Sequence, residues 1–99
     1  MSNVFEVIDK TGRTIYLTKE RWTHITSPQS PHAYMTNHLE DIHQTIIKPD
    51  TIIVSDDDDK KAKYYKFYKE KKKYLRTFIK YLNGKGYIIT AYFVRNIEK

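Results

Sequence analysis

Apolar and polar residues near the start of the chain predict a short β-hairpin that leads into a helix. Residues 3–9 have the pattern of a strand, and the Asp-Lys-Thr-Gly turn that ends at Gly12 leads back into a second strand over residues 13–17. Thr18 is a good N-cap, and the residues after it favour a helix up to about residue 26.

The next segment predicts a loop and a second helix. Residues 27–35 contain two prolines and are expected to form a loop. Asn37 and Glu40 have the spacing of a capping box. The helix is expected to end near Lys48, because Pro49 disfavours helical geometry in the residue before it. Apolar residues follow the cap at helical intervals: Leu39, Ile42 and Ile46.

The second half of the chain has the pattern of strands. A β-branched run over residues 51–54 is followed by a polar loop over 55–63 and by three further segments, 64–69, 73–82 and 87–95. The tight turns expected between the last three segments, at residues 70–72 and 83–86, favour antiparallel pairing. The fold class predicted for the single domain 1–99 is therefore α+β, with two helices from the N-terminal half packed on a mostly antiparallel sheet. This sheet has about four main strands, with a short N-terminal β-hairpin.

Strand alternation sorts the side chains of this sheet into two faces. Lys66 shares a face with Tyr64 and Tyr68, and Thr90 shares a face with Ile88 and Tyr92. Between them, Arg76, Phe78 and Lys80 alternate with Leu75, Thr77, Ile79 and Tyr81. Two helices cover one face, so the polar residues of the other are expected to form a basic floor. Lys66, Thr90 and Tyr92 are expected to meet there if the register allows.

Composition limits the chemistry that is open to the protein. The chain has 99 residues and no cysteine, which excludes disulfides, thiolate zinc sites and cysteine nucleophiles. No apolar run approaches the ~20 residues of a membrane span, and the first ten residues do not form a signal peptide. A cytoplasmic protein without a membrane partner is expected.

Charge is divided unevenly along the chain. The first 59 residues carry 5 Lys and Arg against 10 Asp and Glu, whereas the remainder carries 13 against 2. Tyrosines and phenylalanines are interleaved with the C-terminal lysines, so that segment offers stacking as well as positive charge. An AT-rich coding bias also produces such a composition, but the interleaving favours contact with nucleic acid.

The segment RWTHI, residues 21–25, places Arg21 and His24 one helical turn apart. An imidazole exchanges protons near neutral pH, and a guanidinium binds a phosphate with two hydrogen bonds. Lys66 stands between tyrosines and is a candidate for stabilising charge on a phosphate. The alternatives are a surface histidine, an arginine paired with a neighbouring glutamate, and a solvated strand lysine.

Metal chemistry has weaker support. Asp56–Asp59 form an acidic run, but without interleaved glycine or a distal glutamate they match no cation-binding loop, so a solvated turn is expected. His38 and His43 are five residues apart, which is not the helical spacing of a metal-binding pair. No metal or other cofactor is therefore predicted.

The ordered segments of the chain resemble the phage-associated barnase–EndoU–colicin–RelE-like nucleases, which are small metal-independent ribonucleases. The matching segments are FEVIDKTGR at 5–13, LTKERWTHI at 17–25, PDTI at 49–52, YYK at 64–66 and IITAYF at 88–93. The resemblance implies His24, Lys66, Thr90 and Tyr92 as catalytic residues and Arg21 as a phosphate ligand. One departure is Ser30-Pro31-His32, where such proteins often have a His-Pro-Glu-like segment.

The resulting hypothesis is a small metal-independent endoribonuclease, a toxin or phage-linked effector that cleaves cellular RNA by attack of the 2′-hydroxyl. Tyr64, Arg76 and Lys80 are further candidates for substrate contact. A cognate antitoxin or inhibitor protein is the expected partner, and an acidic one would suit the basic surface. The alternatives are a catalytically inactive nucleic-acid-binding module and a protein-interaction domain that inhibits a host factor through the acidic run.

Overall fold

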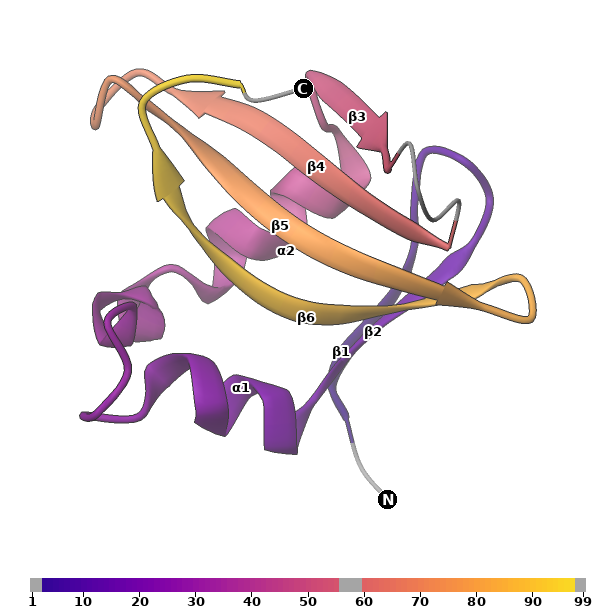
Figure 1. Ribbon diagram of the computed structural model, residues 1–99, viewed down its shortest axis with the longest axis horizontal. Helices are drawn as coiled ribbons and strands as arrows, with labels where there is room; N and C mark the ends of the chain where they lie inside the picture. Colours follow the sequence, from indigo (N-terminus) through magenta and orange to yellow (C-terminus); the bar gives the residue numbers. More distant parts are fainter. Residues whose placement is uncertain (1–2, 56–59, 98–99) are drawn as a thin grey trace.

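Two α-helices and a six-stranded mixed sheet make up the α+β fold of the protein, as seen in a computed structural model that describes residues 3–55 and 60–97 (Figure 1). The strands lie in the order β1-β2-β6-β5-β4-β3, and the sheet is not closed into a barrel. The elements are β1 Asn3–Ile8, β2 Thr14–Thr18, α1 Lys19–Thr26, the 3₁₀ helix η1 Ala33–Asn37, α2 Leu39–Ile47, β3 Thr51–Val54, β4 Lys61–Tyr68, β5 Lys73–Leu82 and β6 Lys85–Val94.

The N-terminal hairpin is part of the main sheet, so the sheet has six strands and not the predicted four main strands. β2 pairs with β6 in parallel over three residues, from Thr14 opposite Lys85 to Tyr16 opposite Tyr87. Gly86 permits this close approach, because a Cβ there would lie 2.5 Å from Cδ1 of Ile15. Strand pairing between segments so far apart in sequence leaves no local trace in the hydrophobic pattern.

Several local predictions are confirmed. Thr18 caps α1, and its hydroxyl accepts a hydrogen bond from the amide of Arg21 at 3.2 Å. Asn83 and Gly84 both have positive φ angles, 52° and 79°, as a two-residue hairpin turn between β5 and β6 requires. The N-cap of α2 is His38 and not Asn37, because Asn37 is taken up as the last residue of η1.

The strand register separates two faces of the sheet. One face is covered by α2 and the core, and Tyr64, Thr77 and Ala91 lie side by side on it. The opposite face, called here the outer face, carries Tyr65, Arg76 and Tyr92 at the same level. The alternation predicted for residues 75–81 is confirmed by this register.

A bulge in β6 changes the faces predicted for that strand. Ile88 pairs with Ile79 and is buried in the core, whereas Thr90 pairs with Phe78 on the outer face. Ile89 is the additional residue between the two pairs. The prediction that Ile88 and Thr90 share a face is therefore wrong, because strict alternation does not hold across a bulge.

A buried polar cluster fastens the hairpin to the core. Asp9 is 6% exposed and accepts hydrogen bonds from the hydroxyl of Tyr64 and from the amides of Thr11 and Arg13. The hydroxyl of Tyr64 also lies 2.7 Å from that of Tyr81. Burial and these bonds raise the pKa of Tyr64 far above its usual range, so it stays protonated. α1 follows β2 without a loop and begins after its N-cap Thr18, at the other end of β2.

Two observations bear on the remaining sequence predictions. Among residues 3–55 and 60–97, no helix is long and apolar enough to cross a bilayer. The acidic run Asp56–Asp59, on which the protein-interaction alternative depends, lies outside the residues that the structure describes.

Candidate nucleic-acid interface

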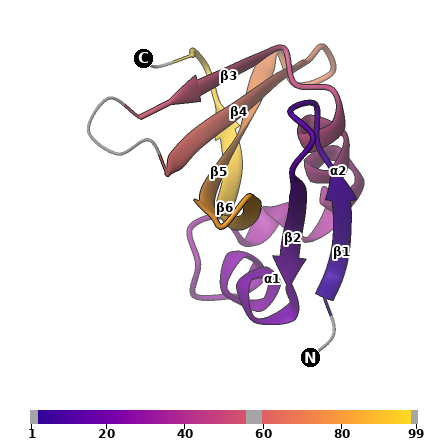
Figure 2. The same cartoon turned by 90° about the vertical axis from the view of Figure 1, so that its right-hand side faces the viewer.

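The outer face of the sheet combines aromatic rings with positive charge. In β4, β5 and β6 none of its residues is acidic, and the side chain of Tyr65 is fully buried within it. These residues are Lys61, Lys63, Tyr65, Phe67, Tyr74, Arg76, Phe78, Lys80, Leu82, Lys85, Tyr87, Thr90, Tyr92 and Val94. The same face continues over Tyr16 of β2 to Glu6 of β1. Aromatic side chains on a basic surface stack bases while the cations neutralise phosphates. Figure 2 shows the sheet from its side, with α2 on the face opposite to this surface.

Arg76 lies at the centre of the outer face and is 8% exposed. Its Nη2 donates to the hydroxyl of Tyr92 at 2.7 Å, and its Nη1 lies 3.5 Å from the hydroxyl of Tyr65. The guanidinium carbon is 4.9 Å from the ring centroid of Tyr92 and 5.1 Å from that of Phe78. Burial opposes the charged form, but the hydrogen bonds to Tyr65 and Tyr92 outweigh it and raise the pKa of Arg76. The guanidinium of Arg76 is therefore a fixed, partly desolvated cation packed against the aromatic rings of the outer face.

His32 reaches the outer face from the loop between α1 and η1. Its ring is stacked on that of Tyr92, with centroids 4.2 Å apart and an interplanar angle of 16°. Burial lowers the pKa of His32 below its usual value, which favours the neutral ring. Sequence reasoning assigned no role to this residue. The sequence held no signal for it, because Ser30-Pro31-His32 departs from the expected His-Pro-Glu-like segment and has its histidine at the third position.

Arg21 and His24 lie on α1, alongside β6. β2 runs parallel to β6, and α1 continues from β2 in the same direction (Figure 1). A hollow of about 430 Å³ opens between α1 and the sheet. It is lined by Thr18, Glu20, Arg21, Lys61, Lys80, Leu82, Tyr87, Ile88 and Ile89. Arg21 thus joins outer-face lysines at one end of the surface. His24 is exposed and lies one turn further along α1, outside the residues that line this hollow.

The structure separates Lys66 from the residues that it was expected to meet. Lys66 pairs with Leu75 on the helix-covered face, and its Nζ donates to the carbonyl of Lys48 at 3.2 Å. Thr90 and Tyr92 lie on the outer face. The prediction that Lys66 shares a floor with them is therefore wrong: the faces alternate as predicted, but the helices cover the one that holds Lys66.

Tyr64 is also displaced from the predicted site. Its side chain is fully buried in the core, where Asp9 and Tyr81 bind its hydroxyl. It therefore has no surface to offer a substrate. Arg76, Lys80, Thr90 and Tyr92, by contrast, share the outer face, and Arg21 borders it.

Within the described ranges, no group of three His, Asp or Glu side chains is close enough to hold a metal ion. Comparison of the chain with protein-family models, with curated proteins and with solved structures finds no match. The resemblance to the nuclease family thus stays a prediction that is carried by the quoted segments.

Proposed function

We propose that the protein is a metal-independent endoribonuclease that binds single-stranded RNA on the outer face of its sheet. The observation that carries the proposal is the cluster of Arg76, Tyr92 and His32. An imidazole and a guanidinium both lie within 5 Å of the centroid of one exposed-face tyrosine ring, at 4.2 and 4.9 Å. Base stacking, charge stabilisation and proton transfer thereby meet at one point.

The reaction assigned to this surface is transesterification of an RNA phosphodiester. Neutral His32 takes the proton of the 2′-hydroxyl, and the resulting oxygen attacks the adjacent phosphorus. His24 donates a proton to the departing 5′-oxygen, which leaves a 2′,3′-cyclic phosphate on one product. Arg76 stabilises the negative charge that develops on the phosphate.

The remaining outer-face residues hold the substrate in this scheme. Arg21 and Lys80 line the same hollow and are suited to a neighbouring phosphate. The hydroxyl of Thr90 and the ring of Tyr92 position the scissile nucleotide. The hydrogen bond from Arg76 supports the orientation of Tyr92.

The biological setting proposed is that of a cytoplasmic toxin or phage-linked effector that acts on cellular RNA. The positive outer face, with Lys61, Lys63, Arg76 and Lys80 side by side, supports an acidic inhibitor protein as its partner. Such an inhibitor would cover the surface that binds RNA.

A catalytically inactive RNA-binding module is the second candidate. The position of Lys66 favours this candidate. Lys66 lies on the helix-covered face, so one of the expected catalytic groups is missing from the outer face. The module would use the same basic and aromatic residues and would not need His24 or His32.

Cleavage of labelled RNA in the presence of EDTA tests the proposal. We expect wild-type protein to cleave, and His24→Ala and His32→Ala each to lower the rate by about 10²-fold to 10⁴-fold with RNA binding retained. His43→Gln, on α2 and edge-on to Phe5, is the matched control and is expected to cleave normally.

Three other outcomes decide between the alternatives. Salt-dependent binding without cleavage by wild type supports the inactive module. Normal cleavage by His32→Ala contradicts the mechanism. Protein that neither binds nor cleaves any RNA leaves the protein-interaction alternative.

The lowered pKa of His32 predicts the pH dependence of cleavage. A base must be neutral to accept the 2′-hydroxyl proton, so the rate falls as the pH drops through the pKa of His32. Because burial lowers that pKa from 6.5, the midpoint of the acidic limb is expected below pH 6.5. The pH profile of kcat/KM, which reports the pKa values of the free enzyme, measures this limb, and a midpoint above pH 6.5 argues against His32 as the base.

A further inference from the structure

A second hollow lies on the side of the sheet opposite to the outer face, where η1 meets α2. It has a volume of about 600 Å³ and mixes aromatic, imidazole and charged side chains. The lining consists of Tyr34, Asn37, His38, Glu70, Lys71, Lys73 and Phe93. It is separate from the hollow between α1 and the sheet, with which it shares no lining residue.

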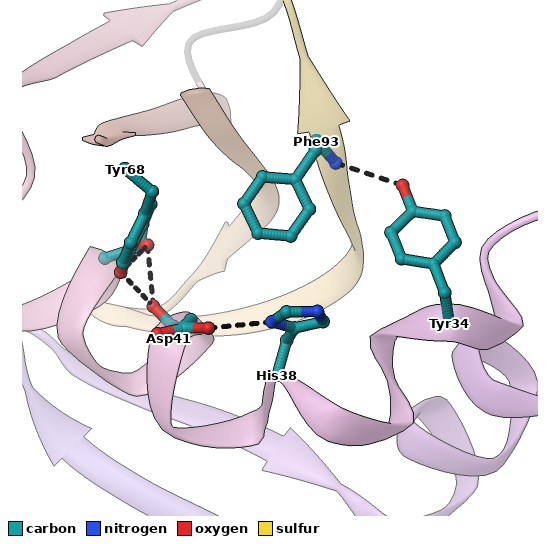
Figure 3. A network of polar contacts seen from close by, with 6 residues as sticks. Tyr34, His38, Asp41, Tyr68 and Phe93 are labelled. Carbon is teal, nitrogen blue, oxygen red and sulfur yellow. Dashed lines mark hydrogen bonds and ion pairs between the residues drawn. The ribbon is translucent and has the colours of Figure 1, made fainter. Parts of the chain in front are cut away.

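His38 is held in a defined orientation at the base of this hollow. Its Nδ1 lies 2.8 Å from Oδ2 of Asp41, and its ring stands edge-on to Phe93 with centroids 5.1 Å apart. The hydroxyl of Tyr68 donates to the backbone carbonyl of Asp41 at 2.7 Å and steadies that residue in turn. Figure 3 shows the other nitrogen of the His38 ring pointing away from Asp41, on the side of Tyr34.

Several residues that line this hollow have no part in capping α2. His38 is the N-cap of α2 and Asp41 lies in its first turn, so the pair by itself has a structural use. Tyr34, however, is 46% exposed, and its hydroxyl accepts a hydrogen bond from the amide of Phe93 at 3.2 Å. The ammonium of Lys71 lies 5.2 Å from the ring centroid of Phe93. An exposed aromatic ring beside an imidazole and two lysines is suited to a base and its phosphate.

Ring contacts join this hollow to the outer face. Tyr92 and Phe93 are consecutive in β6 and therefore point to opposite faces of the sheet. His32 stacks on Tyr92, and its centroid is 6.3 Å from that of Tyr34, which is in turn 6.3 Å from that of Phe93. His32 and Tyr34 thus form a continuous row of ring contacts around the edge of β6, from the outer face to the hollow.

We propose that the hollow is a second nucleotide-binding subsite for the same RNA strand. The strand leaves the outer face at His32, passes around the edge of β6, and places one base against Tyr34. Its phosphate lies among Lys71, Lys73 and His38. Glu70 also lines the hollow, but the two lysines outweigh its charge. This inference rests on the proposed RNA binding of the outer face.

The length dependence of RNA binding tests the subsite, and the turn between β4 and β5 offers a matched control. Uridine oligonucleotides of about 4 and about 12 residues are compared by fluorescence anisotropy, with every protein carrying His24→Ala so that the RNA is not cleaved. Lys71→Ala/Lys73→Ala removes the two lining lysines. Lys69→Ala/Lys72→Ala removes the same charge from the same exposed turn but leaves the lining intact. We expect the first pair to weaken binding of the longer RNA about tenfold more than the second, with little difference for the shorter one.

A nucleotide titration separates this inference from the proposed function. Uridine 5′-monophosphate is added to wild-type protein, and the imidazole C–H signal of His38 is followed by NMR; a saturable shift is expected. If the two lysine pairs behave alike and His38 does not respond, the subsite is overturned while RNA binding by wild type stands. If His38 responds but no RNA is bound, the proposed function fails and the path for an RNA strand fails with it.

Discussion

Arg76→Lys is expected to lower the rate of RNA cleavage by about a hundredfold, although the positive charge is kept. Arg76 reaches two tyrosines from one planar group, with Nη2 on the hydroxyl of Tyr92 and Nη1 near that of Tyr65. A lysine has a single ammonium and cannot reproduce this fork or its stacking on Phe78 and Tyr92. The ring of Tyr92 then loses its fixed orientation, and with it the surface on which His32 is stacked.

The controls for Arg76→Lys separate the site from general charge and from folding. Arg95→Lys makes the same exchange at an exposed position beyond β6 and is expected to cleave as wild type does. Tyr92→Phe removes the acceptor but keeps the stacking ring, so a smaller loss is expected. Thermal unfolding confirms that each variant is folded at the assay temperature. A folded Arg76→Lys protein that cleaves within a few-fold of wild type would show that the guanidinium has no special role.

The local elements of this fold can be predicted from the sequence, because each depends on residues that are close together in the chain. The cap at Thr18, the turn at Asn83-Gly84 and the alternation of residues 75–81 are set by neighbours within a few positions. β5 is a long central strand without a bulge, so its two faces follow directly from its sequence. The same rule fails in β6, where Ile89 is the additional residue.

The choice of the covered face depends on contacts that the sequence does not display. Tyr64, Lys66 and Tyr68 were placed correctly on one face, but a tyrosine pair flanking a lysine does not have the pattern of a core. Both tyrosines are tolerated there because distant groups bind their hydroxyls: Asp9 and Tyr81 for Tyr64, and Thr45 and the carbonyl of Asp41 for Tyr68. These partners are brought together only by the tertiary fold.

The histidines show the same limit. His32 and His38 were given no role, since neither has a chemical partner at a recognisable spacing for catalysis or metal binding. In the structure, a loop carries His32 onto Tyr92, and Asp41 orients His38. The candidate site therefore combines residues of β5 and β6, which the sequence analysis identified, with His32 from a loop. The path of that loop cannot be predicted from neighbouring residues in the sequence.

Asp9→Ala is expected to lower the free energy of unfolding by about 3 kcal/mol, the largest effect on stability of any change considered. Asp9 is 6% exposed and accepts hydrogen bonds from Tyr64, from the amide and hydroxyl of Thr11, and from the amide of Arg13. Alanine leaves these donors without their acceptor and removes the tie between the hairpin and the core. Urea denaturation followed by tyrosine and tryptophan fluorescence measures the loss.

Asp9→Asn and Glu6→Ala show whether the hydrogen bonds of Asp9 are the cause. Asparagine keeps one oxygen for the turn amides and offers an amide group to the hydroxyl of Tyr64, so an intermediate loss is expected. Glu6 is an exposed acid in the same hairpin, and its loss is expected to cost no more than about 0.5 kcal/mol. If Asp9→Ala proves as mild as Glu6→Ala, the hairpin is held by its strand pairing with β6 alone. If the large loss is found, one buried carboxylate at the turn end of the hairpin holds β1 and β2 to the core, and α1 continues directly from β2.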